Sequence, residues 1–164
     1  MSTTTKICRS YSVSETPRPS GQLRYDLAGE GVEKSPAGVE PCVLVVDDDP
    51  DITRFIKAAL ATRGVGCLAA YDAMQGFLVA QRQRPALVLV DWHMPAGGGQ
   101  LLIRKLHQHT PTKNIPVYVV TADTSPGIDA EATSQGARGV LRKPIDPMQL
   151  LDLLAPHLSG PDKA

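Results

Sequence analysis

The stretch CVLVVDDDPD, residues 42–51, drives an uninterrupted run of buried-type side chains into a dense group of carboxylates. The short all-apolar run CVLVV is typical of a strand that is buried on both faces of a parallel sheet. Four carboxylates then fall within five positions, at Asp47, Asp48, Asp49 and Asp51. Adjacent carboxylates repel one another, so the group indicates either a solvated loop that caps the next helix or a site for a cation.

The composition of the chain excludes several classes of partner. Its 164 residues include 17 basic and 17 acidic side chains, giving a net charge of +0, and this length suits one domain. Balanced charge provides no global field for nucleic acid or an anionic membrane, and no helix-turn-helix or zinc-finger pattern is found. The sequence has neither a signal-peptide core nor a membrane-spanning run. Three widely separated cysteines argue against a disulfide scaffold, which suits a cytoplasmic protein. From the charge and the missing motifs we expect no nucleic-acid or membrane partner.

The texture of the sequence changes at Pro41. Residues 1–40 are rich in Ser, Thr, Pro and Gly and are expected to form a flexible leader, and residues 160–164 a short tail. Between them, over residues 41–159, apolar runs alternate with amphipathic stretches. The expected strands are 42–46, 65–70, 86–90, 115–120 and 139–143, and the expected helices begin at residues 50, 73, 100, 128 and 147. Five βα units in succession predict an α/β fold, a doubly wound five-stranded parallel sheet.

The ends of these strands carry the polar residues that suggest chemistry. In a doubly wound sheet, ligands bind beyond the carboxyl ends of the strands, where the strand order reverses. Those ends carry, in order, Asp47 and Asp48, Asp91, Thr121 and Lys143. Carboxylate oxygens suit Mg²⁺, while a lysine and a hydroxyl would bind phosphoryl oxygens and one carboxylate would form an aspartyl phosphate. The opening acidic cluster is therefore predicted to be one corner of a phosphoryl-transfer site.

Four motifs at these strand ends resemble the receiver domain of two-component response regulators. They are VLVVDDD (43–49), LVLVDWHMPAGGG (87–99), VVTA (119–122) and RKP (142–144). Each motif is weak alone, but their order and spacing together are specific, and the resemblance extends to about residue 158. It implies a flavodoxin-like (βα)5 fold with strand order 2-1-3-4-5.

The resemblance also implies roles for individual residues. Asp91 would be the phosphoacceptor and Mg²⁺ the cofactor. The implied metal ligands are Asp47, Asp48, Asp91 and the backbone carbonyl of His93. The implied switch and phosphate-binding residues are Thr121, Ala122 and Lys143, and Pro144 is expected to follow a cis peptide bond. Asp49 is expected to cap the next helix instead of binding metal.

Two features depart from the family's pattern. Val140 occupies the switch position where the family commonly has Tyr or Phe, which puts aromatic gating of the signal in doubt. Gly97, Gly98 and Gly99 follow the Met-Pro pair and predict a mobile loop. Trp92, beside the predicted acceptor, is either a partner contact or a packing residue.

Three functions are weighed against these motifs. The first is a stand-alone response regulator, since only six residues follow Leu158, that accepts a phosphoryl group from a histidine kinase or histidine phosphotransfer protein and acts on an unidentified protein target. It would not be an enzyme, apart from losing its own phosphoryl group. The second is a pseudo-receiver that binds partners without phosphorylation, which the complete set of acids, threonine and lysine disfavours. The third, a haloacid-dehalogenase-type phosphatase, is disfavoured because Asp51 replaces the Thr or Val of that family's first motif.

Overall fold

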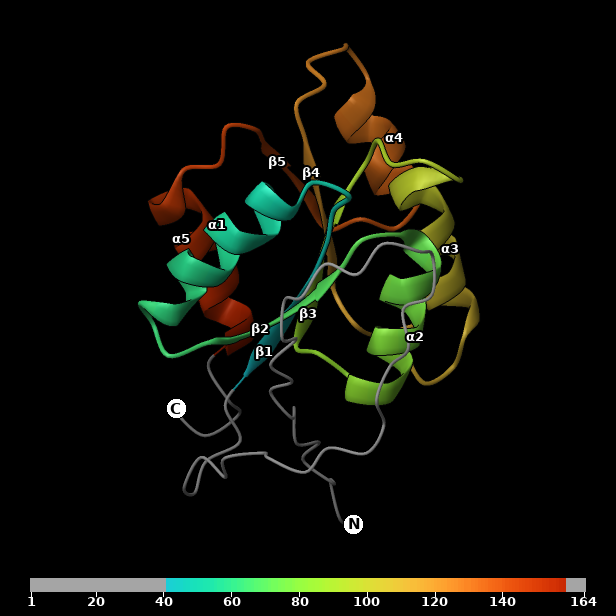
Figure 1. The fold of residues 1–164 in the computed structure, drawn as a ribbon. Coiled ribbons are helices and arrows are strands. Elements are labelled where there is room, and N and C mark those ends of the chain that lie inside the picture. Colours follow the sequence, from blue (N-terminus) through green and yellow to red (C-terminus); the bar gives the residue numbers. More distant parts are fainter. Residues whose placement is uncertain (1–40, 159–164) are drawn as a thin grey trace, which may run out of the picture.

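The computed structural model describes residues 41–158, and the sequence-based predictions for 1–40 and 159–164 lie outside the described residues. Strands and helices alternate along the whole described chain (Figure 1). The strands are β1 (Cys42–Val46), β2 (Gly66–Ala70), β3 (Leu87–Asp91), β4 (Val117–Thr121) and β5 (Gly139–Arg142). The helices are α1 (Pro50–Ala61), α2 (Ala73–Gln83), α3 (Gly98–Gln108), α4 (Ile128–Ser134) and α5 (Pro147–Leu158). The predicted succession of five βα units is confirmed.

All five strands are parallel and lie in the order β2-β1-β3-β4-β5, the flavodoxin-like arrangement. The chain moves outward from β1 to β2 and then returns to place β3 on the other side of β1. The strand order therefore reverses between β1 and β3, where doubly wound folds bind their ligands. Both of these strands are buried along their full length, as their unbroken apolar runs predict.

The helices cover both faces of the sheet. In Figure 1, α1 and α5 lie on one side of the strands and α2, α3 and α4 on the other. Alternate side chains of each strand serve these two layers: Val43 and Val45 pack with α1 and α5, while Leu44 and Val46 pack with α2 and α3. This double cover explains why the central strands contain no polar residue before their carboxyl ends.

The helix starts follow local sequence signals. The Asp49 side chain caps α1 by accepting a hydrogen bond from the Asp51 N–H, and Pro50 stands in the first turn, as predicted. At α3 the prediction is wrong, because the helix begins at Gly98, two residues before the expected start. A Cβ at Gly98 would lie 2.5 Å from the Trp92 carbonyl oxygen, and one at Gly99 2.7 Å from that of Asp91. Because they have no Cβ, these two glycines let α3 pack closely against the end of β3. They lie in the first turn of the helix and not in the predicted loop.

Several side chains depart from their expected burial. Phe55 lies at helical spacing from the apolar residues Ile52 and Ile56 of α1, yet it is 41% exposed, and Met74 and Leu78 of α2 are also exposed. Trp92 is buried in the core on the α2 and α3 side, which decides its alternatives in favour of packing. Of the cysteines in the described region, Cys67 is a free thiol. Within residues 41–158, no helix is both long and apolar enough to cross a bilayer.

Candidate phosphoacceptor site

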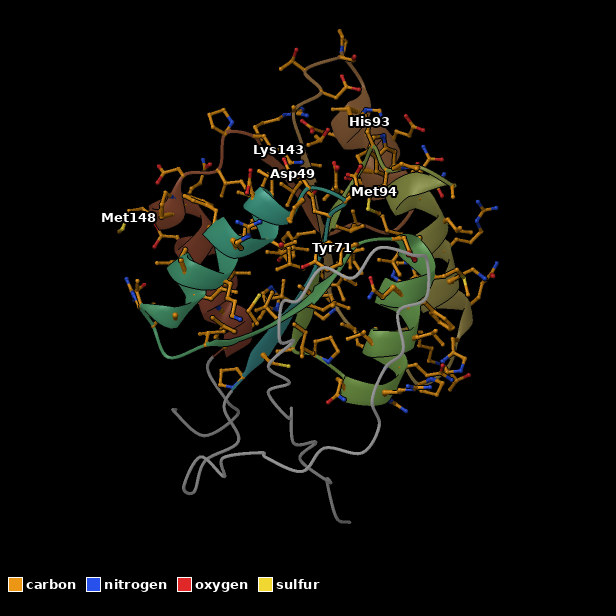
Figure 2. All side chains as sticks on the ribbon, in the orientation of Figure 1. Asp49, Tyr71, His93, Met94, Lys143 and Met148 are labelled. Carbon is orange, nitrogen blue, oxygen red and sulfur yellow. The ribbon has the colours of Figure 1, made fainter. Side chains whose placement is uncertain are left out.

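The predicted carboxylates and Lys143 come together at the carboxyl edge of the sheet, and Figure 2 labels Lys143 and His93 there, in its upper half. Asp47 follows β1 directly, Asp91 is the last residue of β3, and Thr121 is the last residue of β4. Lys143 follows β5. Since β1 and β3 are neighbours at the reversal of strand order, Asp47 and Asp91 face the same point from adjacent strands.

The carboxylates lie close enough to bind one ion. One oxygen from each of Asp47, Asp48 and Asp91 lies within 4.8 Å of the others. Asp47 and Asp91 are buried, whereas Asp48 is exposed at the mouth of the cluster. The Lys143 Nζ reaches in from β5, 2.8 Å from Asp47 Oδ2 and 3.5 Å from Asp91 Oδ2. The ammonium thus contacts two of the three carboxylates, those of Asp47 and Asp91.

The electrostatics of the cluster are unbalanced. Burial, reinforced by the negative charge of Asp47, raises the pKa of Asp91 against the opposing effects of Lys143 and the His93 N–H. Burial alone lowers the pKa of Lys143, but its hydrogen bond to Asp47 and the charges of both aspartates outweigh it, so that pKa is raised. Lys143 is therefore held as a cation, and the ionised form of Asp91 is disfavoured until further positive charge arrives.

The backbone shapes the two acidic loops around this centre. The Asp49 N–H donates to Asp47 Oδ1 at 2.8 Å, and the His93 N–H approaches Asp91 Oδ1 at 3.3 Å. Each carboxylate keeps a second oxygen that faces Lys143. Asp49 itself is used in capping α1, so the structure separates it from the metal-binding group as the sequence predicted.

The remaining predicted residues lie on or directly after β4 and β5. The Thr121 side chain is fully buried and its Oγ1 accepts a hydrogen bond of 3.0 Å from the Asp123 N–H. Ala122 is exposed beside it. The Lys143–Pro144 peptide bond is cis, as the resemblance implied. Val140 is half-buried and packs against the core on the α2, α3 and α4 side.

Sequence reasoning missed a set of contacts between the loops above the site. The exposed His93 ring donates from Nε2 to Asp123 Oδ2 at 2.8 Å, joining the loop after β3 to the loop after β4 (Figure 2 labels His93 beside α4). Arg142 donates to the Asp123 carbonyl oxygen and, from its other nitrogen, to Asp129 Oδ1 at 2.7 Å. These residues lie 13 to 30 positions apart, and no periodicity or motif links them.

The donor set fits a hard divalent cation. All three converging side chains are carboxylates, two of them are buried, and the cluster has more negative charge than Lys143 offsets. Magnesium prefers oxygen ligands of this kind and keeps part of its water shell, which the exposed position of Asp48 permits.

Comparison with known proteins identifies this arrangement. The response regulator receiver domain family matches residues 43–155. The chain belongs to this family. It is a receiver domain of two-component response regulators, and its fold, with five parallel strands in the order 2-1-3-4-5, is the one expected of such domains.

Individual relatives are of two kinds. Protein PilH of Pseudomonas aeruginosa is 33% identical over 118 residues, which cover 72% of this chain and 98% of PilH. The phosphate regulon transcriptional regulatory protein PhoB of the same species is 32% identical over 109 residues, 66% of this chain but only 48% of PhoB. Among solved structures, the Vibrio cholerae chemotaxis protein CheY4 has 29% identity and a TM-score of 0.68, covering 73% of this chain and 99% of CheY4. The receiver fold thus occurs both as nearly a whole protein and as about half of one.

Proposed function

We propose that this receiver domain accepts a phosphoryl group on Asp91, in a Mg²⁺-dependent reaction, from a histidine kinase or a histidine phosphotransfer protein. One observation carries the proposal: the buried Asp91 carboxylate lies 3.5 Å from Lys143 and within one cation-sized cluster with Asp47 and Asp48. A nucleophilic carboxylate, a phosphate-binding ammonium and a metal-binding pair are the parts that carboxylate phosphorylation requires.

Each residue has a distinct part in this reaction. An Asp91 oxygen attacks the phosphorus atom while the bond from phosphorus to the donor nitrogen breaks, leaving the donor histidine to take up a proton. Lys143, already held as a cation by Asp47, binds one phosphoryl oxygen. The Thr121 hydroxyl, whose oxygen now accepts from Asp123, donates to another. The donor group must reach Asp91 from the exposed side of the cluster, where Asp48 lies.

Asp47, Asp48 and Asp91 would hold the Mg²⁺ ion, with the His93 carbonyl as a further ligand. When bound, the ion neutralises phosphoryl charge and orients the phosphoryl group for transfer. The excess of carboxylates over ammonium groups in the cluster supports this assignment.

Phosphorylation by a small donor tests the proposal directly. With Mg²⁺ and acetyl phosphate, the full chain should gain one acid-stable, base-labile phosphoryl group, detected by intact mass. Asp91→Asn should abolish this gain and excess chelator should reduce it strongly. Asp51→Asn, at an exposed aspartate in the first turn of α1, should leave it unchanged. Full modification of Asp91→Asn would refute the assignment.

The rival functions make different predictions in the same assay. A pseudo-receiver would gain no phosphoryl group under any condition. A haloacid-dehalogenase-type phosphatase would turn over a generic phosphate ester, whereas we propose that this chain is no enzyme beyond hydrolysing its own aspartyl phosphate.

We further propose that the signal passes by contact with an unidentified cytoplasmic protein, without nucleic acid or membrane. PilH, of which this chain covers 98%, supports action by the receiver alone. Thr121→Ala should leave Asp91 able to accept a phosphoryl group but uncouple it from change at the surface of α4, β5 and α5. Val140→Tyr should alter that coupling without altering uptake. Backbone chemical shifts before and after phosphorylation measure both effects; retention of every wild-type shift in Thr121→Ala would contradict the role of the hydroxyl.

A further inference from the structure

A polar chain of contacts connects the predicted switch threonine to the first turn of α4. It runs through Thr121, Asp123, Arg142 and Asp129, which we call the polar relay, and each neighbouring pair is joined by a hydrogen bond. The relay begins at the fully buried Thr121 side chain and ends at Asp129, an exposed side chain of α4. It therefore spans the distance from the site to the surface.

Asp123 is the central residue because four of its polar groups are engaged at once. Its N–H donates to Thr121 Oγ1 at 3.0 Å, and its carbonyl oxygen accepts from Arg142. Its carboxylate accepts from the Ser125 N–H at 2.8 Å and from His93 Nε2 at 2.8 Å. The hydrogen bonds from Ser125, with that of His93, lower the pKa of Asp123 to about 2. The loop after β4 is thus fixed through one residue.

This fixed loop opposes any movement of Thr121. If the hydroxyl turns toward a phosphoryl group on Asp91, the Asp123 N–H must either lose its acceptor or follow it. Following it displaces the Asp123 carbonyl oxygen and carboxylate, which Arg142 and His93 hold. Since Arg142 also holds Asp129 in the first turn of α4, the displacement reaches that helix.

The position of Arg142 matters because Val140 is its neighbour on the same face of β5, two residues earlier. Valine has no ring that can move between the core and solvent. Gln100 of α3 adds a second tie to α4, through Glu131 at 3.0 Å, so both acidic residues of the first turn are held from outside the helix. The hydrogen bonds of Arg142, and not an aromatic side chain, are placed to carry a change at Thr121 outward.

We propose that Arg142 is a positioning residue that couples the state of Asp91 to α4 through the polar relay. The inference rests on the proposed phosphorylation of Asp91. It predicts that removing the guanidinium separates two responses that are joined in the wild type: the response of the site and the response of α4.

The test uses isotopically labelled full chain and beryllium fluoride with Mg²⁺ as a phosphoryl mimic. In wild type, amide shifts should change at Asp91, Asp123 and throughout α4. In Arg142→Met the changes at Asp91 and Asp123 should persist, while those of α4 lose most of their size. Arg54→Met, which removes an exposed arginine paired with Asp51 on α1, is the matched control and should behave as wild type.

The outcomes separate the two proposals. Full wild-type shifts of α4 in Arg142→Met would overturn the relay while leaving the phosphoacceptor intact. Absence of any shift at Asp91 and Lys143 in wild type would overturn the proposed function and the relay with it. Asp129→Ala, which removes the acceptor of the Arg142 hydrogen bond, serves as a second variant: it should reduce the α4 response in the same way as Arg142→Met, and an unchanged response would count against the relay.

Discussion

At the carboxyl edge of the sheet three carboxylates cluster and one lysine contacts two of them, whereas at the amino edge the Tyr118 hydroxyl and the His157 ring form one pair, 2.8 Å apart. The first group concentrates charge of one sign around a buried acid. The second satisfies two half-buried polar groups and stacks their rings edge to face, with centroids 5.5 Å apart. The difference indicates which edge is the functional one. The Tyr118–His157 pair satisfies its own polar groups, whereas the carboxylate cluster keeps an excess of negative charge that only a bound cation would neutralise.

Removal of Lys143 should give the largest loss of stability. Lys143→Met leaves the buried Asp47 and Asp91 without a counter-charge, and losing one partner of a buried pair costs roughly 3–5 kcal/mol. Since the Lys143 side chain is 18% exposed, we expect the lower end of that range or somewhat less. Urea denaturation measures the loss, Mg²⁺ should restore part of it, and Lys113→Met on an exposed loop is the control. A loss no greater than that of the control would mean that the cluster is already balanced by solvent.

Removal of the charge on Asp91 should have a smaller effect of opposite sign. Because burial raises the folded-state pKa of Asp91, the folded protein gains stability from this group at low pH and loses it as the pH rises through that pKa. At pH 7 without Mg²⁺, Asp91→Asn should therefore raise the melting temperature. Adding Mg²⁺ should stabilise the wild type more than the variant. A lower melting temperature for the variant in metal-free buffer would show that the hydrogen bonds of the carboxylate outweigh its charge.

The residues of the carboxyl edge could be predicted from sequence because each one ends or directly follows a strand with a clear apolar pattern. Asp47, Asp91, Thr121 and Lys143 converge as soon as five parallel strands are assumed. The start of α3 was not readable, because the low helix propensity of glycine hides the need of Gly98 and Gly99 for close approach to β3.

Contacts between loops were also hidden. In the sequence, Asp123 looks like an ordinary loop residue. Its contacts with His93 and Arg142 are visible only in the tertiary structure. Phe55 shows the limit of helical periodicity: it continues the apolar stripe of α1 but lies at its border, and Thr53 is buried in its place. The spacing of apolar residues predicts which side of a helix is buried, but the elements that pack against the helix decide how wide the buried face is.

The balanced pair at the amino edge should give the smallest effect. Burial, followed by the charge of Arg138, lowers the pKa of His157 below its usual value, so the unfolded chain binds a proton there more readily than the folded one. Its contribution to stability is therefore present above about pH 6.5, the unperturbed histidine value, and is lost as the pH falls toward the lowered pKa. Because the pair is only half-buried, the loss should stay below about 1 kcal/mol. Chemical denaturation at pH 7.5 and pH 5.5 should show a drop in wild type that is smaller in His157→Leu, whose other histidines are unchanged. An equal drop in the free energy of unfolding of both proteins would mean that another group causes the pH dependence. The Tyr118–His157 contact would then contribute by packing alone.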